Sequence, residues 1–196
     1  MLFRSDAESW NVRDRHMMET LNRLLDYHGP LSKVIVWEHN SHIGDARATD
    51  MEAQGMINLG QLARQRYVKE GVIRIGFGTN SGTVLAGTSW GAKMKTMNLP
   101  PAKEDSWENL LHQASSSNKI LISSRLKQHK LFRQPIDQRA VGVVYRPEQE
   151  SWGNYVPSLI PQRYEAFVYI DSTTALHPFH VDADPKQFPE TYPFGL

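Results

Sequence analysis

The stretch VIVWEHNSHIGDARATD, residues 34–50, places two histidines and several acidic side chains directly after an apolar run. His39 and His42 are three residues apart, with Glu38 just before them and Asp45 just after them. A neutral imidazole can accept a proton near neutral pH, and a neighbouring carboxylate can fix its tautomer. The pattern therefore favours proton-transfer chemistry. The alternative is a polar loop whose histidines cap backbone groups.

Metal binding is a second chemistry that a His-x-x-His pair allows, but a zinc site normally needs a third protein ligand. The chain contains no cysteine, which excludes disulfides, zinc–thiolate sites and a cysteine nucleophile. It also lacks a G-x-S-x-G motif, so a serine triad on an α/β-hydrolase elbow has no support. We therefore expect neither a metal nor a cofactor.

The glycine-rich stretch GFGTNSGTV, residues 76–84, follows a strand-like run and suggests a phosphate-binding loop. Its spacing is not G-x-G-x-x-G, and TVLAG follows where pyrophosphate binding requires a helix N-terminus. We interpret the stretch as a turn at the end of a strand, with Thr79 and Asn80 as candidate pocket-lining residues. A nucleotide-binding fold is the least favoured alternative.

Two arginines could hold an anionic group of a substrate, because a guanidinium group binds carboxylates and phosphates bidentately. Arg13 lies at the start of a predicted helix in WNVRDRHM, and Arg146 follows a strand-like run in VVYRPE. A surface or structural role is the alternative for both. Asp14, next to Arg13, is explained by the favourable position of an acidic residue near a helix N-terminus.

Helical patterns alternate along the chain with short, almost continuous apolar runs. Apolar residues at 3.6-residue spacing predict helices over 11–28, with Asn11 as the cap, and over 53–67, and a third helix begins at Ser106. Apolar runs predict strands at KVIVWE (33–38), VIRIGF (72–77), TVLAG (83–87), KILIS (119–123), RAVGVVY (139–145) and EAFVYID (165–171). This alternation is typical of a layered α/β fold with a mostly parallel sheet.

In such a sheet, functional groups collect just beyond the carboxyl ends of the strands. Side chains alternate faces along a strand, so the chain must leave strand geometry near His39, with Asn40 and Ser41 making a turn. That turn can bring His42 back beside His39. We therefore predict that the two imidazoles line one cavity.

The remaining polar side chains near the histidine pair are expected to line or support that cavity. Asp45 and Arg47 are predicted to orient the histidines, and Thr79 and Arg146 to lie at the same end of the sheet. The full set of candidate substrate-binding or supporting residues is Glu38, Asn40, Asp45, Arg47, Arg13, Thr79 and Arg146.

Several blocks together resemble the erythromycin esterase family: WNVRDRHMMETL, VWEHNSHIGDARATDM, GQLARQRY, GFGTNSGTV, the PPA of the 99–102 loop, and GVVYRPE. Their order and spacing are similar to the C-terminal half of that family, from about residue 10 to about residue 172. The HN-x-H-x-GDAR stretch is the most specific of them.

The resemblance implies a three-layer α/β/α fold and hydrolysis of an ester, which in the better-known members is the lactone of a macrolide antibiotic. It thereby implies a role in antibiotic resistance. It also implies a metal-independent mechanism in which a histidine base activates water. His39 and His42 match the two C-terminal active-site histidines of the family. Relatives more often have a small residue at the position of Glu38, so no role is transferred to that residue.

One departure from the family concerns the N-terminal half, which carries the presumed catalytic base in a motif like GEATHG. The chain has no such segment. We therefore expect residues 1–196 to be the C-terminal part of a larger hydrolase domain, with 178–196 as a Pro- and aromatic-rich surface tail. Weak independent stability is expected, or pairing with the N-terminal half or with another chain, because a sheet edge would be uncovered. A non-catalytic ligand-binding or interaction domain is the alternative function.

Composition narrows the class of partner. The net charge is +1 and the basic residues are dispersed, so there is no electrostatic footprint for nucleic acid. No apolar run reaches 18 residues, which argues against a membrane span. The expected partner is a small-molecule ester or lactone, and the expected location is the cytoplasm because the first ten residues lack the apolar core of a signal peptide.

Overall fold

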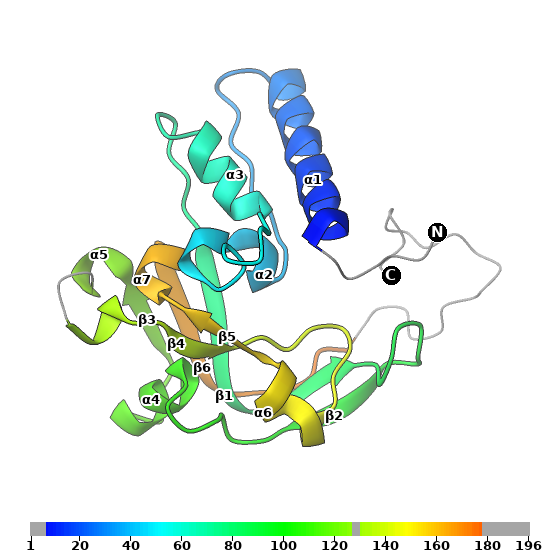
Figure 1. The fold of residues 1–196 in the computed structure, drawn as a ribbon, viewed down its shortest axis with the longest axis vertical. Helices are drawn as coiled ribbons and strands as arrows, with labels where there is room; N and C mark the ends of the chain where they lie inside the picture. Colours follow the sequence, from blue (N-terminus) through cyan, green and yellow to red (C-terminus); the bar gives the residue numbers. More distant parts are fainter. Residues whose placement is uncertain (1–6, 127–129, 178–196) are drawn as a thin grey trace.

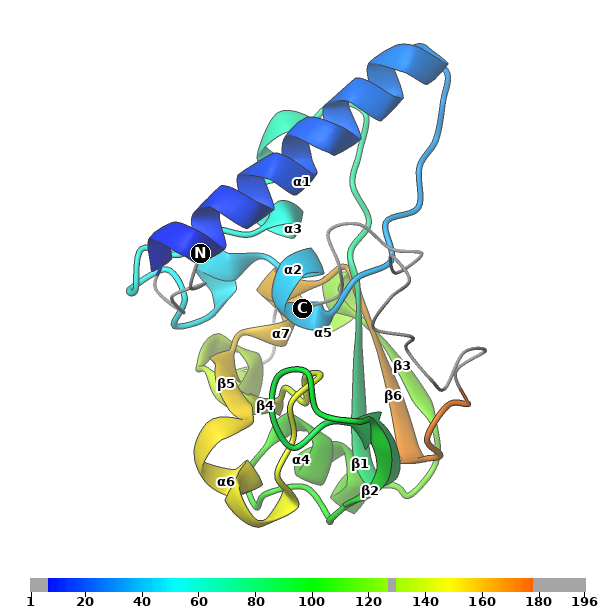
Figure 2. The same ribbon diagram turned by 90° about the vertical axis from the view of Figure 1, so that its right-hand side faces the viewer.

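The computed structural model describes residues 7–126 and 130–177. Figures 1 and 2 show a sheet region on one side and a pair of helices that stands apart from it. The helices are α1 (Ala7–His28), α2 (Asn40–Ile43), α3 (Leu59–Arg66), α4 (Trp107–Ala114), α5 (Ser123–Leu126), α6 (Glu150–Gly153) and α7 (Ile160–Arg163). The strands are β1 (Ile75–Ala86), β2 (Lys95–Leu99), β3 (Lys119–Ile122), β4 (Ile136–Arg139), β5 (Tyr155–Ser158) and β6 (Ala166–Thr173). Short 3-10 turns occupy Ala46–Ala48, Lys130–Arg133 and Pro147–Gln149.

The main sheet is mixed, with the strand order β2-β1-β6-β3. Only β1 and β6 are parallel, and β2 and β3 flank them antiparallel. β4 and β5 form a separate antiparallel pair. The prediction of an α/β fold is confirmed, but the expected mostly parallel sheet is wrong for the described residues. Two of its three strand pairs are antiparallel because β2 follows β1 through a hairpin and β3 runs against β6.

The glycine-rich stretch 76–84 is part of a strand and not a turn. β1 runs through it without interruption for 12 residues and pairs with β6 along most of that length. Gly82 has φ +126, and a Cβ atom there would lie 2.0 Å from the carbonyl oxygen of Thr173. Glycine therefore lets the strand bend where an alanine would clash. Local turn signals failed here because pairing with β6 overrides them.

The run KVIVWE was predicted as a buried strand, and this prediction is also wrong for the described structure. Residues 33–38 are extended but belong to no sheet, and Ile35 and Trp37 are about nine-tenths exposed, at 90% and 87%. The Trp37 ring lies 6.1 Å from the Phe77 ring on β1, so the segment runs beside the sheet. An apolar run indicates that a segment tends to be buried. It does not determine whether a neighbouring strand is present to pair with that segment.

The helix predictions were right in type and wrong at their ends. α1 begins by Ala7, so Asn11 is not its cap, and the Asn11 side chain instead bonds the backbone of Gly55 and Ile57. The second helix is shortened to α3, which Asn58 caps through a bond from the Gln61 amide. The expected helix after Ser106 is confirmed as α4, with Ser106 as its cap.

The later strand predictions also divide. KILIS and EAFVYID are confirmed as β3 and β6. The predicted strand 139–145 is wrong, because only Arg139 belongs to β4 and Val144 makes a single bridge to Gly87. β2, β5 and most of β4 were not predicted. The tail 178–196 lies outside the described residues.

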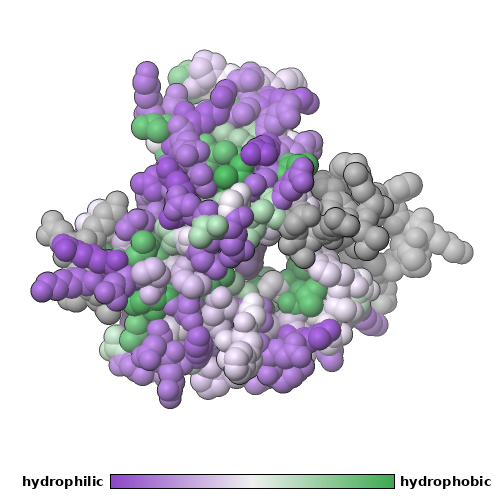
Figure 3. All heavy atoms as spheres, in the orientation of Figure 1, coloured by the Kyte–Doolittle hydropathy of each residue, from purple (hydrophilic) through white to green (hydrophobic). Residues whose placement is uncertain are grey.

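Three buried hydrophobic clusters hold these elements, and one of them, Ala86, Met97, Leu99 and Tyr145, lies at β1 and β2. The sheet packs on a fully buried aromatic cluster formed by Trp107, Ile160, Tyr164, Phe167 and Tyr169. α1 and α3 pack on each other through a second cluster, Met18, Leu21, Leu59 and Ala63. Figure 3 shows hydrophobic residues in patches among hydrophilic ones on one face, with a hollow near the middle. α2 lies between the sheet region and the α1–α3 pair in both ribbon views (Figures 1 and 2).

Candidate functional site

The short helix α2 carries both candidate histidines and is fixed at several points. His39 is its N-cap and accepts a hydrogen bond from the Ser41 amide. The Asn40 side-chain amide pairs with both backbone groups of Phe77 on β1, at 2.6 and 3.0 Å, as a neighbouring strand would. Asn58, which caps α3, donates to the Ser41 carbonyl oxygen. These bonds attach α2 both to the sheet and to the α1–α3 pair.

His42 is paired with the buried carboxylate of Asp14 on α1. Its Nδ1 lies 3.0 and 3.1 Å from the two Asp14 oxygens, and Asp14 is fully buried. Asp14 also accepts a hydrogen bond from the Leu59 amide at the start of α3. The Trp10 ring stacks on the imidazole at 4.5 Å, and Arg13 Nη2 lies 3.3 Å from its Nε2. A carboxylate at Nδ1 fixes the tautomer and orientation of an imidazole and supports a positive charge on it.

His39 is held by different partners. Its Nδ1 faces the Ser41 hydroxyl at 2.9 Å and its Nε2 faces the Val141 carbonyl oxygen at 3.0 Å. A carbonyl accepts only, so Nε2 is the protonated nitrogen and Nδ1 the acceptor, as in a neutral imidazole. Burial of the ring lowers its pKa, against the opposing effect of the Val141 carbonyl. Although the residue keeps contact with solvent, the neutral form is favoured.

Glu38 lies within electrostatic reach of the pair formed by Asp14 and His42. Burial raises the pKa of its carboxyl group, while the nearby His42 opposes the rise and Asp14 adds to it. Its Oε2 atom is buried and has no hydrogen-bond partner among the described residues. The carboxyl group is therefore poised to take up a proton more readily than an ordinary glutamate.

A cavity of ≈ 470 Å³ opens beside α2. His39, Asn40, Thr79 and Arg139 supply polar groups to its wall, as do three threonines of the β1 and β6 region. The rest of the wall is formed by Phe77, Gly78, Val84, Leu85, Leu99, Val141, Gly142, Ile170, Ala175 and Leu176. A mostly apolar cavity of this size with a few convergent polar groups is typical of a small-molecule site.

Two placements, those of His42 and Arg146, correct the predicted site. Only His39 lines the cavity; His42 is not in its wall, because its ring is packed between Asp14 and Trp10. Thr79 lies in the wall as expected. Arg146 does not: it is exposed and donates to the Thr88 carbonyl oxygen.

Arg139, and not the predicted Arg146, is the arginine in the cavity wall, and its buried guanidinium is bonded to protein groups. Its Nη1 donates to the carbonyl oxygens of Thr79 and Asn80, and its Nε donates to Glu150. The only sequence signal was a charged residue directly before the apolar run AVGVV. That position fits a strand end as well as a buried site.

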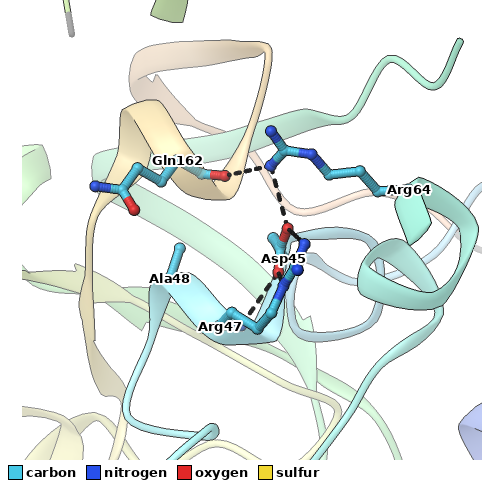
Figure 4. Close-up of a pocket in the computed structure, with 5 residues that line it drawn as sticks. All are labelled: Asp45, Arg47, Ala48, Arg64 and Gln162. Carbon is cyan, nitrogen blue, oxygen red and sulfur yellow. Dashed lines mark hydrogen bonds and ion pairs between the residues drawn. The ribbon is translucent and has the colours of Figure 1, made fainter. Parts of the chain in front are cut away.

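Asp45 and Arg47 do not contact the histidines. Arg47 bonds Asp45 through Nε at 2.9 Å and Nη2 at 2.8 Å, and Arg64 approaches the same carboxylate (Figure 4). Arg74 lies 3.0 Å from it as well. The carboxylate that orients a histidine is Asp14. The sequence prediction had explained Asp14 by the helix dipole alone, since the residue lies 28 positions from His42 and nothing local links them.

Two negative findings apply to the described residues. No group of three or more His, Cys, Asp or Glu side chains there could hold a metal ion. No described helix is both long enough and apolar enough to cross a membrane.

Solved structures of three larger proteins have a similar fold. A succinoglycan biosynthesis protein matches with a TM-score of 0.68 and 17% identity over 87% of this chain and 40% of its own. A Bacillus cereus protein matches with a TM-score of 0.68 and 16% identity over 86% and 40%. A mutant of the erythromycin esterase EreC, in its open conformation, matches with a TM-score of 0.55 and 16% identity over 84% and 38%.

At these identities the structural matches show the fold alone. The chain spans about 40% of the length of the solved chains it matches. The sequence comparison goes further, because the erythromycin esterase family profile matches residues 1–173, which is most of the 196-residue chain. The chain therefore belongs to the erythromycin esterase family.

Proposed function

We propose that this chain forms the C-terminal part of a hydrolase that cleaves a carboxylic ester or lactone with water. The observation that carries the proposal is the Asp14–His42 pair next to His39, which faces a mostly apolar cavity. A carboxylate-oriented imidazole and a second, neutral imidazole are the groups that general acid–base hydrolysis needs. Membership of the family supports the same reaction class.

Each group has a separate role in this proposal. His39 contacts the substrate or the attacking water from the cavity wall, and it can exchange a proton because its neutral form is favoured. Asp14 accepts from His42 Nδ1 and so holds the ring in one tautomer and one orientation. Arg13 Nη2, 3.3 Å from His42 Nε2, donates to the ring on the side opposite Asp14 and helps to fix its orientation. No step requires a metal.

The shape of the cavity supports an ester or lactone with a large apolar part. Its wall is formed mainly by apolar side chains of β1, β2 and β6. Desolvation of an apolar substrate there would be favourable, at about 25 cal/mol per Å² of apolar surface buried. The acyl or alcohol portion would occupy this region, and the carbonyl group would lie toward His39. A macrolide lactone satisfies this description, and so do many simpler esters.

We further propose that residues 1–196 complete their active site with an N-terminal half or another chain. The chain spans about 40% of the solved proteins it matches. Residues 34–37 are exposed and belong to no sheet, and Trp37 lies beside Phe77 of β1, where an added strand could pair. In the complete protein that segment would join the sheet. Helices on both faces of the enlarged sheet would then make a three-layer α/β/α domain.

The direct test is hydrolysis by the complete protein with an ester and lactone panel that includes macrolides. We expect turnover that survives dialysis against EDTA. The His39→Gln variant should be inactive yet fold normally, and Arg146→Gln, which changes an exposed arginine outside the cavity, should leave activity intact. Absence of turnover across the panel would refute the proposal, and loss of turnover on chelation would refute its metal-independent mechanism.

A ligand-binding module without chemistry is the second candidate. The observation in its favour is that all four ring nitrogens of the two histidines already have protein partners. Such a site can bind a substrate without offering a free base. Equilibrium binding of an ester by the complete protein, with no product after prolonged incubation, would favour this candidate over the hydrolase.

A further inference from the structure

A second cavity lies at the GDAR stretch, residues 44–47. Its volume is ≈ 450 Å³, and its wall is formed by Asp45, Arg47, Ala48, Arg64 and Gln162. None of these residues lines the cavity at His39. Figure 4 shows the Arg47 and Arg64 side chains converging on Asp45 from different elements. The proposed hydrolysis uses neither arginine, so it does not explain why Arg47 and Arg64 lie together at this cavity.

One carboxylate is shared by three guanidinium groups at this place. Asp45 Oδ2 lies 2.8 Å from Arg47 Nη2, 3.1 Å from Arg64 Nη1 and 3.0 Å from Arg74 Nη1. Burial opposes ionisation of Asp45, but the hydrogen bonds and charges of its arginines outweigh that effect and hold its pKa below the ordinary value. Asp45 is therefore ionised at neutral pH, and both of its carboxylate oxygens already contact arginine groups.

The other carboxylate of the cluster is that of Glu165, which pairs with Arg74. Glu165 accepts bonds from Arg74 Nε at 2.9 Å and Arg74 Nη2 at 2.5 Å, which neutralises that buried guanidinium. The cluster contains three guanidinium groups and two carboxylates, so its net charge is one positive charge. Because Glu165 neutralises Arg74, this excess charge is shared by Arg47 and Arg64. Glu52 lies within electrostatic range of Arg47, but it is exposed to solvent, where a charge is well screened.

Arg47 and Arg64 also keep donors that the protein does not use. Their side chains are 40% and 39% exposed, and both line the cavity. Among the described residues, Arg47 Nη1 and the Nε and Nη2 atoms of Arg64 have no hydrogen-bond partner. Asp45 fixes one edge of each guanidinium, so the free edges are held in place before any ligand arrives. Such preorganised donors bind anions well, because little side-chain entropy is lost on binding.

We propose that this cavity binds an oxyanion, the carboxylate or phosphate group of a small molecule, between Arg47 and Arg64. The guanidinium fork matches the geometry of both groups. The cavity is several times larger than a bare anion, so it also accommodates an organic part of the ligand beside Ala48 and Gln162. The site is independent of the histidine cavity and of ester hydrolysis.

The test is titration of the 196-residue chain with inorganic phosphate, followed by NMR of the arginine Nε–H resonances at constant ionic strength set with chloride. We expect saturable shifts of Arg64 Nε–H. Separate titrations with acetate distinguish a carboxylate site from a phosphate site. Arg64→Gln should weaken the tighter-binding anion about tenfold or more, the scale of a lost charge-assisted hydrogen bond. Arg66→Gln is the matched control, because Arg66 is exposed on the same helix, lies over the Tyr67 ring and is not in the cavity wall.

Three outcomes decide the proposal. Saturable shifts that Arg64→Gln weakens and Arg66→Gln does not would support it. Shifts that do not saturate, or that Arg64→Gln leaves unchanged, would overturn it and leave the cluster a purely structural ion network. If Arg64→Gln fails to fold, the wild-type resonances still decide, since an anion bound elsewhere would leave Arg64 Nε–H unmoved while other arginine signals shift.

Discussion

At the scale of single residues, the two histidines of α2 differ more than their shared motif indicates. His39 faces the cavity and is held by Ser41 and the Val141 carbonyl oxygen. His42 is withdrawn from the cavity and paired with a buried carboxylate. His39 therefore contacts the substrate in the proposed reaction, and His42 lies behind it, oriented by Asp14.

We expect His39 to contribute more to catalysis than Glu38 in the complete protein. An imidazole can exchange a proton near neutral pH, whereas Glu38 does not line the cavity. His39→Ala should lower kcat/KM by about 10²- to 10⁴-fold, and Glu38→Gln by much less. Steady-state kinetics of both variants on one ester would test this. Near-normal kcat/KM in the His39→Ala protein would remove His39 from the mechanism.

Asp14 is expected to act through His42, and Asp14→Asn separates that role from its structural one. The asparagine oxygen can still accept from the Leu59 amide, so stability should change little. Its NH₂ group would instead face His42 Nδ1 and impose the other tautomer. We expect kcat to fall at least about tenfold with a similar urea midpoint. A parallel loss of stability and activity would show that Asp14 is structural only.

Sequence reasoning at this scale found His39, Asn40 and Thr79, because polar residues directly after apolar runs are a local signal. It missed Asp14 and Arg139 as site residues. Asp14 reaches its partner across 28 positions, through the packing of α1 against α3. Contacts of that kind depend on tertiary structure, which no spacing in the sequence records.

At the scale of elements, α4 joins the sheet through a buried carboxyl group. Glu108 is fully buried, and its Oε2 accepts from the Arg139 amide at 3.0 Å while Oε1 has no partner among the described residues. Burial raises the pKa of Glu108 to about 7, against the opposing effect of the Arg139 bond. The folded protein therefore holds a proton there that the unfolded chain, with a pKa near 4.5, has released.

This shift predicts a pH dependence of stability. Between pH 4.5 and about 7 the folded state binds more protons at Glu108, so its contribution to stability falls as pH rises and levels off above 7. The total loss is on the order of 3 kcal/mol. Glu108→Gln should remove this slope and raise the urea midpoint at pH 8 relative to wild type. Parallel pH profiles for the two proteins would contradict the assignment.

The bend of β1 at Gly82 supplies the second prediction at this scale. Gly82→Ala places a Cβ atom at positive φ and 2.0 Å from the Thr173 carbonyl oxygen on β6. The conformational strain alone costs about 1–3 kcal/mol, and the clash adds to it. Gly153→Ala is the control, because no atom lies within 4 Å of its Cβ position. Equal urea midpoints for the two variants would show that the bend is not required.

Elements with local signals were predicted well and those that depend on neighbours were not. α4 has its cap in Ser106, and β3 and β6 are short apolar runs that pair with each other. By contrast, KVIVWE has the composition of a central strand and remains outside the sheet, whereas GFGTNSG has the composition of a turn and lies inside β1. Composition indicates which secondary structures a segment can form. Whether it joins a sheet depends on the presence of a partner strand.

At the scale of the whole molecule, uncovered apolar side chains are concentrated beside β1. Ile73 and Ile75 lie at its start, and Val34, Ile35 and Trp37 lie on the neighbouring extended segment, all of them exposed. Asn40 already occupies the backbone groups of Phe77, so it marks the place where another strand would continue the sheet. An apolar strip of this kind is typical of a surface that another part of the protein covers.

Hydrogen exchange tests whether the complete protein covers this strip. In the 196-residue chain, the amides of residues 34–37 belong to no sheet, so they should exchange at nearly the rate of an unfolded peptide. In the complete protein, pairing of this segment between β1 and a strand of the other half should slow them by orders of magnitude, whereas β6 amides should be protected in both. Rapid exchange at 34–37 in the complete protein would mean that the segment is a true surface loop. The proposed completion of the sheet would then be wrong, although the pairing of Asp14 with His42, which lies within this chain, would stand.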